Sequence, residues 1–534
     1  MNMTVLSIEE EFALKETVID GRPCRDFADN YQCLSELYHC FADFTDNELV
    51  VYEDERLTYQ ETARLAAALA ENLIRLHSIS PGDRIALVLP NSPDWIIAFL
   101  AITSIGATPA LINARSSDEE LAHCISTTHC IFAFSDRNLP VDIPSIGHRE
   151  TWGDLDQDRL LSQVTRLGSD EALLMFTSGT TGKPKAAILT HRGLMSSLKT
   201  IAFSSAVIAS QMAEKYGVDY ETIVTMRPPP VTLLMFPLFH VSGCHATLLS
   251  ALRQGGKLVL MRRWNAEGAL QLMASEKVTG FPGVPTMHWD ILRLENFEEY
   301  DLSSLTSLSI AGQATTPVLL EAVREAFPNA VLGTGYGMTE CNGTVTLTIG
   351  DSYVDNPRSV GKLVATAEGE TRDDQGSALN TGEVGEIHVR SPALMAGYAN
   401  ADNSNVFDSE GWMATGDVGY FDEDENLYIV DRKTDMVISG GENIYCAEVE
   451  QAFDRHDAVD ECAAYGESDE RLGERLVIVV RTLAGVSKEE LLEHCGSLIA
   501  RYKVPREIYF THDPLPRNAS GKVVKPHLKE TFSN

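Results

Sequence analysis

Positive charge is scarce in this sequence of 534 residues: 43 Lys and Arg stand against 77 Asp and Glu, which gives a formal net charge of −34. Nucleic acid and anionic membrane surfaces are therefore disfavoured as partners. No internal repeat or low-complexity segment interrupts the chain. At this length a single compact core is not expected, so the sequence predicts two or three domains.

A disulfide framework and a signal peptide are also missing. The ten cysteines have no framework spacing, which is typical of reduced thiols in the cytoplasm. The N-terminus, MNMTVLSIEEEFALKE, carries acidic residues where a secretion signal needs basic ones. A cytoplasmic location is therefore predicted.

Two groups of histidine and cysteine residues raise the question of a zinc site. His123-Cys124 and His129-Cys130, or His240 with Cys244 and His245, have ligand types that bind zinc, but no matching second ligand pair stands out. The cysteines of the first group are better explained as small core residues where a helix runs into a strand.

The uncharged stretch from Trp95 to Ala114 is long enough to cross a bilayer. Gly106 and Pro109 divide it, and a Pro-rich turn precedes it. We therefore predict a buried helix followed by a buried strand, and no membrane span.

The apolar runs indicate an α/β fold. Arg84–Leu89 and Lys257–Met261 predict buried strands, and Leu57–Leu76 has helical spacing. Gly385–Arg390 and Gly419–Val430 predict antiparallel strands, so the sheets are expected to be mixed.

A short charged run, Asp431–Asp435, separates two apolar strands. The segment beyond it, about 100 residues long, has strand and helix patterns of its own and is long enough for a small α+β domain. We predict an N-terminal domain over 1–431, a hinge at 432–434 and a C-terminal domain over 435–534.

The segment FTSGTTGKPK, Phe176–Lys185, predicts a phosphate-binding loop. It carries four hydroxyl side chains, two glycines and two lysines. A Walker A loop is excluded because Gly179 and Gly182 are too close together and Pro184 follows Lys183. A loop rich in hydroxyl and backbone N–H donors still binds phosphates.

Five segments resemble, in order, the motifs of the adenylate-forming superfamily, which includes acyl-CoA synthetases, peptide-synthetase adenylation domains and firefly luciferase. They are FTSGTTGKPKAAILTH at 176–191, PLFHVSG at 237–243, GYGMTE at 335–340, the run at 414–445, and LPRNASGKVVK at 515–525. The resemblance implies a large N-terminal domain of mixed sheets packed with helices, and a small mobile C-terminal α+β domain.

The resemblance also implies an AMP-forming acyl-CoA ligase that uses ATP, Mg²⁺ and CoA. A fatty, aromatic or alicyclic carboxylate would attack the α-phosphate of ATP to give acyl-AMP and pyrophosphate, and the CoA thiol would then displace AMP. Three alternatives stay open: an enzyme that loads a carrier-protein phosphopantetheine, a luciferase-like oxygenase, and a catalytically dead nucleotide-binding homologue. A homodimer is also left open.

By the same resemblance, the catalytic residues are Lys522, Thr181, Glu340 and His240, with Thr181 and Glu340 binding magnesium. The other residues expected to bind ATP or AMP are Thr177, Ser178, Gly179, Thr180, Gly182, Lys183, Gly312, Gln313, Ala314, Gly335, Tyr336, Gly337, Met338, Thr339, Asp417, Ile429 and Arg432. CoA is expected to meet Ser439, Gly440, Gly441 and Glu442. The acyl pocket is expected to comprise His240, Val241, Gly283, Val284, Ala311 and Gly337.

Three features depart from the family pattern. Thr434 occupies a hinge position that is usually Lys or Asp, and Cys446 occupies one that is usually proline. The interval Leu198–Pro230 is longer than expected, and we predict that it is a surface excursion near the acyl entrance.

Overall fold

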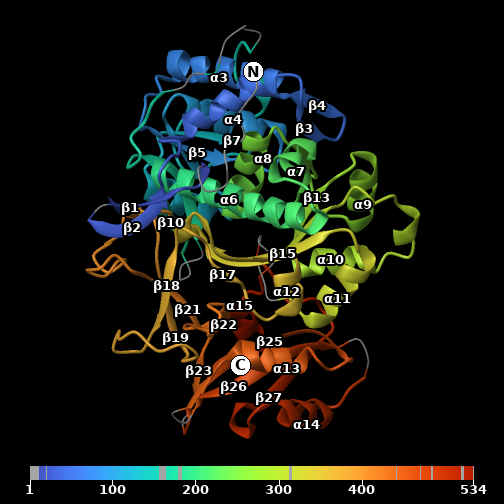
Figure 1. The fold of residues 1–534 in the computed structure, drawn as a ribbon. Coiled ribbons are helices and arrows are strands. Elements are labelled where there is room, and N and C mark those ends of the chain that lie inside the picture. Colours follow the sequence, from blue (N-terminus) through green and yellow to red (C-terminus); the bar gives the residue numbers. More distant parts are fainter. Residues whose placement is uncertain are drawn as a thin grey trace. The chain divides into compact units, whose positions relative to one another are not determined.

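The computed structural model describes residues 11–19, 21–155, 161, 164–177, 183–311, 315–439, 442–469, 471–482, 485–518 and 522–532 (Figure 1). Its contacts group the chain into two compact units. Unit 1 comprises Met1–Glu368 and Arg390–Trp412, and unit 2 comprises Gly369–Val389 and Met413–Asn534. The domain limits expected from the motifs, 1–431 and 435–534 with a hinge at 432–434, stay a prediction.

Unit 1 contains two large mixed sheets. The seven-stranded sheet has the order β20 (Gly397–Tyr398), β10 (Lys185–Thr190), β9 (Glu171–Thr177), β6 (Thr108–Leu111), β5 (Arg84–Val88), β7 (Phe132–Ser135), β8 (Ser145–Ile146). The nine-stranded sheet has the order β17 (Lys362–Leu363), β16 (Gly343–Ile349), β15 (Val331–Met338), β14 (Ser307–Ile310), β13 (Gly280–Gly283), β11 (Val231–Leu234), β12 (Lys257–Leu260), β3 (Glu48–Tyr52), β4 (Glu55–Thr58). A separate hairpin pairs β1 (Leu14–Ile19) with β2 (Arg22–Phe27). Parallel and antiparallel pairings occur in both large sheets, which confirms the predicted mixed α/β architecture.

Helices follow the predicted amphipathic or apolar segments. The main helices of unit 1 are α3 (Tyr59–His77), α4 (Pro93–Ser104), α5 (Asp118–Thr128), α6 (His191–Tyr216), α7 (Tyr220–Met226), α9 (Ala266–Ser275), α10 (Pro285–Leu292) and α11 (Pro317–Ala326). The uncharged stretch after Trp95 forms α4 and β6, as expected, and the side chains of both elements are buried. Ser92 caps α4 and Pro93 begins it, because a proline at the first helical position loses no hydrogen bond.

The prediction for Leu198–Pro230 was wrong in its first half. That half continues α6, where Leu198, Ala206, Ala209 and Ala213 are buried because they recur at helical spacing. Only α7 fits a surface excursion, since none of its residues is buried. α6 is also the one described helix long and apolar enough to cross a membrane, and 56% of its apolar window is buried inside the protein.

Unit 2 contains a four-stranded and a five-stranded sheet. The first has the order β18 (Glu368–Arg372), β19 (Gly385–Arg390), β21 (Met413–Phe421), β22 (Leu427–Arg432). The second contains β24 (Glu442–Ile444), β23 (Val437–Ser439), β26 (Gly473–Thr482) and β25 (Val459–Asp469), with β27 (Glu507–Thr511) also paired to β26. Its helices are α13 (Cys446–Phe453), α14 (Lys488–Leu498) and α15 (Lys525–Phe532). This is the α+β pattern expected of the C-terminal segment.

The alternation of side chains along β26 positions these helices. Leu476, Ile478 and Val480 pack with residues of α13 and α14. Val477 and Val479 face the other way and pack with a cluster that includes Leu528 of α15. α15 therefore packs on the opposite face of the sheet from α13 and α14.

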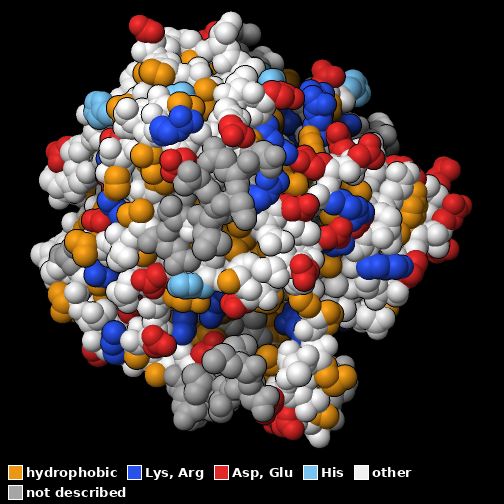
Figure 2. Space-filling model, turned by 90° about the horizontal axis from the view of Figure 1, so that it is seen from above, with side chains coloured by type: hydrophobic (Ala, Val, Ile, Leu, Met, Phe, Trp, Pro, Cys, Tyr) orange, Lys and Arg blue, Asp and Glu red, His pale blue; other side chains and the backbone are white. Residues whose placement is uncertain are grey.

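The negative net charge is spread over the surface. On the face shown in Figure 2, Asp and Glu side chains lie scattered among Lys and Arg rather than gathered into one patch. The face in this view therefore offers no extended basic patch to a polyanion.

Candidate active site

Several of the predicted site residues of unit 1 gather at one edge of the nine-stranded sheet. β11, β13, β14 and β15 are consecutive parallel neighbours. The segments that follow the first three strands carry His240, Val284 and Ala311, while β15 itself leads into Thr339 and Glu340. Because the carboxyl ends of parallel strands meet at one edge, residues far apart in sequence come together there. The backbone N–H of Ala311, for example, donates to Gly283 O at 3.0 Å.

Bare backbone forms one wall of this edge. A Cβ at Gly335 would lie 2.5 Å from Thr346 O, and a Cβ at Gly337 would lie 1.8 Å from Gly343 O. No side chain fits at either position unless the backbone of β16 moves. Tyr336, between the two glycines, is half-buried beside an irregularity in the pairing of β15 with β16. The predicted adenine-stacking tyrosine thus lies in a strand that packs directly against the backbone of β16.

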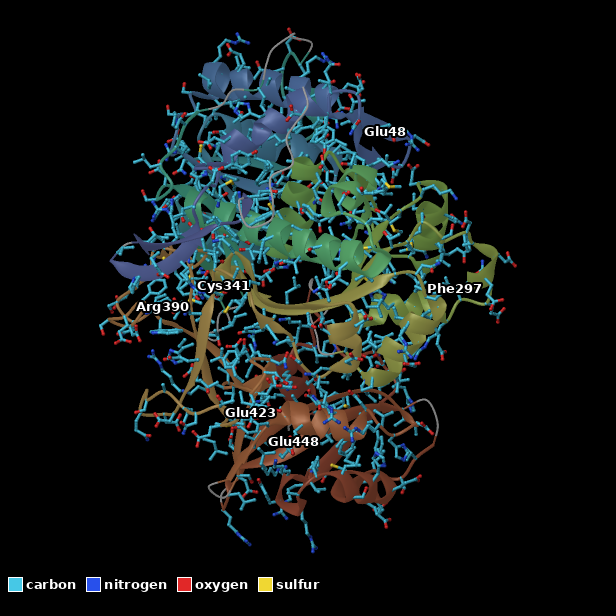
Figure 3. All side chains as sticks on the ribbon, viewed as in Figure 1. Glu48, Phe297, Cys341, Arg390, Glu423 and Glu448 are labelled. Carbon is cyan, nitrogen blue, oxygen red and sulfur yellow. The ribbon has the colours of Figure 1, made fainter. Side chains whose placement is uncertain are left out.

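Glu340 lies in a tight turn, Thr339–Cys341, directly after β15 (Figure 3, where Cys341 is labelled). Its side chain is buried, with 7% of the residue exposed. The Tyr398 hydroxyl donates to Glu340 Oε1 at 2.8 Å, and the Met395 N–H donates to Glu340 O at 2.7 Å. Burial, together with the Glu340 charge, raises the pKa of Tyr398, so this tyrosine remains a hydrogen-bond donor.

Asn342, two residues after Glu340, is held as firmly. Its backbone is left-handed, with φ of 52°, and its side-chain amide donates to Ala393 O at 2.8 Å. Its carbonyl accepts from Ser197 Oγ at 2.8 Å and pairs with His245 Nδ1 at 3.1 Å. Burial lowers the pKa of His245 to about 4, so the imidazole is neutral and Nδ1 carries the proton that Asn342 accepts. This contact explains His245, which the sequence left as a metal-ligand candidate.

The phosphate loop joins β9 to β10. Thr177 ends β9 and pairs with Lys185, the first residue of β10. Residues 178–182, with the predicted Ser178, Gly179, Thr180, Thr181 and Gly182, lie outside the described residues, as do Gly312, Gln313 and Ala314. Lys183 is exposed, with its Nζ 3.8 Å from Glu119 Oε1.

The same loop is anchored by one of the candidate zinc ligands. His123 Nε2 hydrogen-bonds to Pro184 O at 2.9 Å, while Cys124 and Cys130 pack in the apolar core beside β5 and β7. Among the described residues, no group of three or more His, Cys, Asp or Glu is placed to bind a metal ion.

His240 and Val241 follow β11 and lead into a π-helix, Ser242–Leu249. Such irregular helices are frequent at functional sites. Gly243 allows the π-helix to pack closely against the backbone of Pro237, since a Cβ at Gly243 would lie 2.2 Å from Pro237 O. Val241 Cβ lies 3.9 Å from the position that a Gly343 Cβ would take. The predicted acyl-pocket residue Val241 thus lies next to Gly343, the residue whose carbonyl oxygen packs against Gly337.

In unit 2, Asp417 and Arg432 are cross-strand partners on β21 and β22. Arg432 Nε lies 3.1 Å from Asp417 Oδ1, with the arginine side chain 51% exposed and the aspartate side chain 6% exposed. The Asp417 N–H donates to Thr415 Oγ1, and Ile429 pairs with Gly419 on the same two strands. Three residues predicted to hold the nucleotide therefore share one hairpin.

Lys522 closes a small loop near the C-terminus. Its N–H donates to Asn518 Oδ1 at 2.9 Å, and its carbonyl accepts from the Asn518 N–H at 2.8 Å. Three residues later, Lys525 Nζ lies 2.9 Å from Glu450 Oε1 of α13. Lys522 is thus exposed, and the ion pair of Lys525 three residues later is half-buried.

The residues on either side of the predicted hinge, Asp431 and Asp435, contact α13 at its start. The Ala447 N–H donates to Asp431 Oδ2 at 3.2 Å, and Cys446 Sγ donates to Asp435 O at 3.0 Å. The cysteine that departs from the family pattern thus binds the charged run. Burial raises the pKa of Asp431 to about 6. Nearby, Ser439 pairs with Glu442 across β23 and β24, and Gly440 and Gly441 lie outside the described residues.

Two family models match this chain. The family model described as AMP-binding enzyme matches residues 37–399, and the model described as AMP-binding enzyme C-terminal domain matches residues 448–522. The chain therefore belongs to the AMP-binding enzymes, within the adenylate-forming superfamily as an AMP-dependent acyl-CoA synthetase.

Several curated relatives are similar along almost the whole chain. A 3-[(3aS,4S,7aS)-7a-methyl-1,5-dioxo-octahydro-1H-inden-4-yl]propanoyl:CoA ligase of Mycobacterium tuberculosis is 31% identical, covering 91% of this chain and 96% of the relative. A 2-succinylbenzoate–CoA ligase of Bacillus velezensis is 32% identical, covering 90% and 94%. Among solved structures, o-succinylbenzoate CoA synthetase of Bacillus subtilis with its acyl-adenylate has a TM-score of 0.80 and 28% identity, covering 94% and 98%. The same Bacillus enzyme has also been solved with ATP and a magnesium ion.

Proposed function

We propose that this acyl-CoA synthetase activates a carboxylic acid with a bulky apolar body, aromatic, alicyclic or fatty, and transfers it to CoA. ATP, Mg²⁺ and CoA are the cofactors and co-substrates. The observation that carries the proposal is the convergence of Glu340, Gly337, Val241 and Ala311 at one edge of four parallel strands. The Glu340 carboxylate there is buried and hydrogen-bonded, and it follows a strand whose glycines pack directly against β16.

The residues at this edge suit the two parts of the substrate. Glu340 offers one carboxylate oxygen of the hard type that Mg²⁺ prefers, and Thr181 would supply a second oxygen. The bound Mg²⁺ would neutralise charge on the triphosphate. Gly335 and Gly337 would let the nucleotide approach the backbone of β15, with Tyr336 against adenine. Among the described residues after β11 and β13, His240, Val241 and Val284 would meet the acyl group.

Two further sets of residues would complete the reaction. Asp417 and Arg432 would hold the ribose hydroxyls, and Lys522 would bridge the attacking carboxylate and the α-phosphate. After adenylation, rotation of domain 435–534 about 432–434 would withdraw Lys522 and bring Ser439–Glu442 to the CoA thiol. Thiolate attack on the acyl carbonyl would then release AMP.

The relatives support the substrate class. One is named for a propanoate on a fused bicyclic ring system, another for a benzoate with a succinyl group, and a third for a long-chain fatty acid. All three acids join a carboxylate to a large carbon skeleton. We therefore expect this chain to prefer such acids to acetate or to amino acids.

The direct test measures AMP formation over a panel of acids, with and without CoA. The panel contains acetate, octanoate, palmitate, benzoate, 2-succinylbenzoate, a bicyclic indane propanoate and phenylalanine. AMP formation that requires CoA together with a ring-bearing or fatty acid supports the proposal. Pyrophosphate release that CoA does not accelerate would indicate a carrier-protein acceptor instead. Activity with phenylalanine or acetate alone would contradict the proposed substrate class.

We place the enzyme in the cytoplasm, where ATP, CoA and a reducing environment occur together. All ten cysteines are free thiols, as this compartment requires. Cell fractionation checks this location. The homodimer stays a prediction, which light scattering of the purified chain would test.

A further inference from the structure

Residues 393–398 support the Glu340 turn from one side. Ala393 O accepts from the Asn342 amide, the Met395 N–H donates to Glu340 O, and the Tyr398 hydroxyl donates to Glu340 Oε1. Only the last of these bonds reaches the carboxylate itself. Tyr398 comes from β20, at the edge of the other large sheet of unit 1, so it joins the two sheets at the candidate magnesium ligand.

Tyr398 is itself held in place. Its N–H donates to Asn403 Oδ1 at 2.7 Å, and its carbonyl accepts from Asn403 Nδ2 at 3.0 Å. Ala187 on β10 is its strand partner. The hydroxyl is therefore presented to Glu340 from a fixed backbone rather than from a mobile loop.

The face of the Tyr398 ring meets the phosphate loop. Lys185, at the end of that loop, has its Nζ 5.3 Å from the centre of the ring. An ammonium over an aromatic face is attracted to the ring's electrons. One side chain thus contacts both the base of the phosphate loop and the carboxylate.

We propose that Tyr398 is a positioning residue that fixes one oxygen of Glu340 so that the other is presented to Mg²⁺·ATP. A carboxylate bonded through Oε1 is left with Oε2 for the cation, and a single fixed oxygen suits the strict geometry of Mg²⁺. Groups that hydrogen-bond to a metal-binding carboxylate commonly change metal affinity by about 10- to 100-fold when they are removed. The inference rests on the proposed role of Glu340.

The test is the magnesium requirement for ATP binding, measured by calorimetric titration of ATP at a series of Mg²⁺ concentrations with no carboxylic acid present. Tyr398→Phe keeps the ring and its contact with Lys185 and removes only the hydroxyl. We expect it to need about tenfold more Mg²⁺ for half of the maximal gain in ATP affinity. Glu340→Gln should lose most of that gain.

Tyr59→Phe is the matched control. Its buried hydroxyl donates to Gly256 O at 2.9 Å and Ala251 O at 3.1 Å, far from β15 in the sheet order. It should lose a comparable amount of thermal stability and keep the wild-type magnesium requirement. A wild-type requirement in Tyr398→Phe beside a changed one in Glu340→Gln would overturn the positioning role alone. A wild-type requirement in Glu340→Gln would overturn the proposed role of Glu340, and the inference with it.

A second measurement separates positioning from a general structural defect. Acyl-AMP, made from whichever acid the panel identifies, is supplied directly with CoA, so that no triphosphate is involved. Tyr398→Phe should form acyl-CoA at the wild-type rate in this half-reaction. A loss here as large as the loss in adenylation would contradict the proposal, because it would mean that the whole site is deformed.

Discussion

Glu340 and Lys522, the two charged residues assigned to the adenylation step, are held in opposite ways. Glu340 is buried, and hydrogen bonds from Met395 and Tyr398 fix its backbone and its carboxylate. Lys522 is exposed on a loop closed through Asn518. A group that orients a cation benefits from being preorganised. A group that acts in only one half-reaction benefits from being withdrawn with its domain.

The sharpest test of this difference is Lys522→Ala. We expect adenylation to fall about a hundredfold to a thousandfold, the usual cost of removing one group that stabilises transition-state charge. Thioester formation from supplied acyl-AMP should change little, because the proposed domain rotation would withdraw the lysine in that step. Pre-steady-state assays of the two half-reactions measure the split.

Lys529→Ala provides the matched control for Lys522→Ala. Lys529 belongs to the same domain and lies over the Tyr465 ring, with its Nζ 5.7 Å from the ring centre. It should leave both half-reactions at wild-type rates. Equal losses in both half-reactions for Lys522→Ala would remove the contrast between a fixed and a withdrawn group.

Gly335 and Gly337, the two glycines of β15 that precede Glu340, should tolerate no side chain. Gly337→Ala places a methyl group 1.8 Å from Gly343 O, so the backbone must shift. We expect a loss of about 1–3 kcal/mol in unfolding free energy, together with weaker ATP binding. Chemical denaturation and ATP titration measure the two effects.

Gly485→Ala is the same substitution at a position with no neighbour within 4 Å of the added Cβ. It should stay within about 0.5 kcal/mol of the wild-type stability. If Gly337→Ala proved equally harmless, β15 would be more adaptable than its contacts imply.

The sequence was enough to predict which segments form the site but not what supports them. Apolar runs predicted the strands, the segment FTSGTTGKPK predicted a phosphate loop, and the resemblance of GYGMTE to a family motif pointed to Glu340. Tyr398, Ser197 and His245 contact that turn from 58, 145 and 97 residues away in sequence. A single sequence carries no local signal for such pairs, because only the packing of two sheets and α6 brings them together.

The excursion at Leu198–Pro230 shows a related limit of local patterns. Length and the Pro-rich end suggested a surface loop, yet the helical spacing of Leu198, Ala206 and Ala213 extends α6 into the core. Periodicity was the better guide there, because burial of an apolar stripe decides where a helix ends.

The folding stability of the chain should also depend on pH, through His191 at the start of α6. Burial lowers the pKa of His191 from 6.5 to about 4, and the Leu34 N–H donates to its Nδ1. Below pH 6.5 His191 becomes protonated in the unfolded chain, whereas in the folded protein it stays neutral down to about pH 4. Stability is therefore fully present above 6.5 and falls as the pH drops towards 4, by at most about 1.4 kcal/mol per pH unit for this group.

His191→Asn isolates this contribution, because the Asn carbonyl can accept from the Leu34 N–H without titrating. Urea unfolding between about pH 7 and pH 4 should give a shallower loss of stability than in the wild type. Parallel curves for the two proteins would mean that His191 is protonated in the folded state.

The smallest effect on stability is expected at Arg432. Its ion pair with Asp417 involves a side chain that is 51% exposed, and such pairs contribute about 0–1 kcal/mol. Arg432→Gln should melt within a few degrees of the wild type while its KM for ATP rises, because the proposed contact is to the ribose. A large drop in melting temperature with unchanged KM would make the arginine a structural residue.

The burial of the cysteines has a practical consequence for watching the chain at work. Nine of the ten thiols are buried and Cys462 is partly so. Burial raises the pKa of Cys24 to about 11 and that of Cys124 to about 12, which keeps thiolate scarce. The natural chain should therefore react slowly with maleimide dyes. Cysteines introduced at exposed Leu167 in unit 1 and at Gly485 in unit 2 would then take a fluorophore pair, and its energy transfer in single molecules would test the proposed domain rotation.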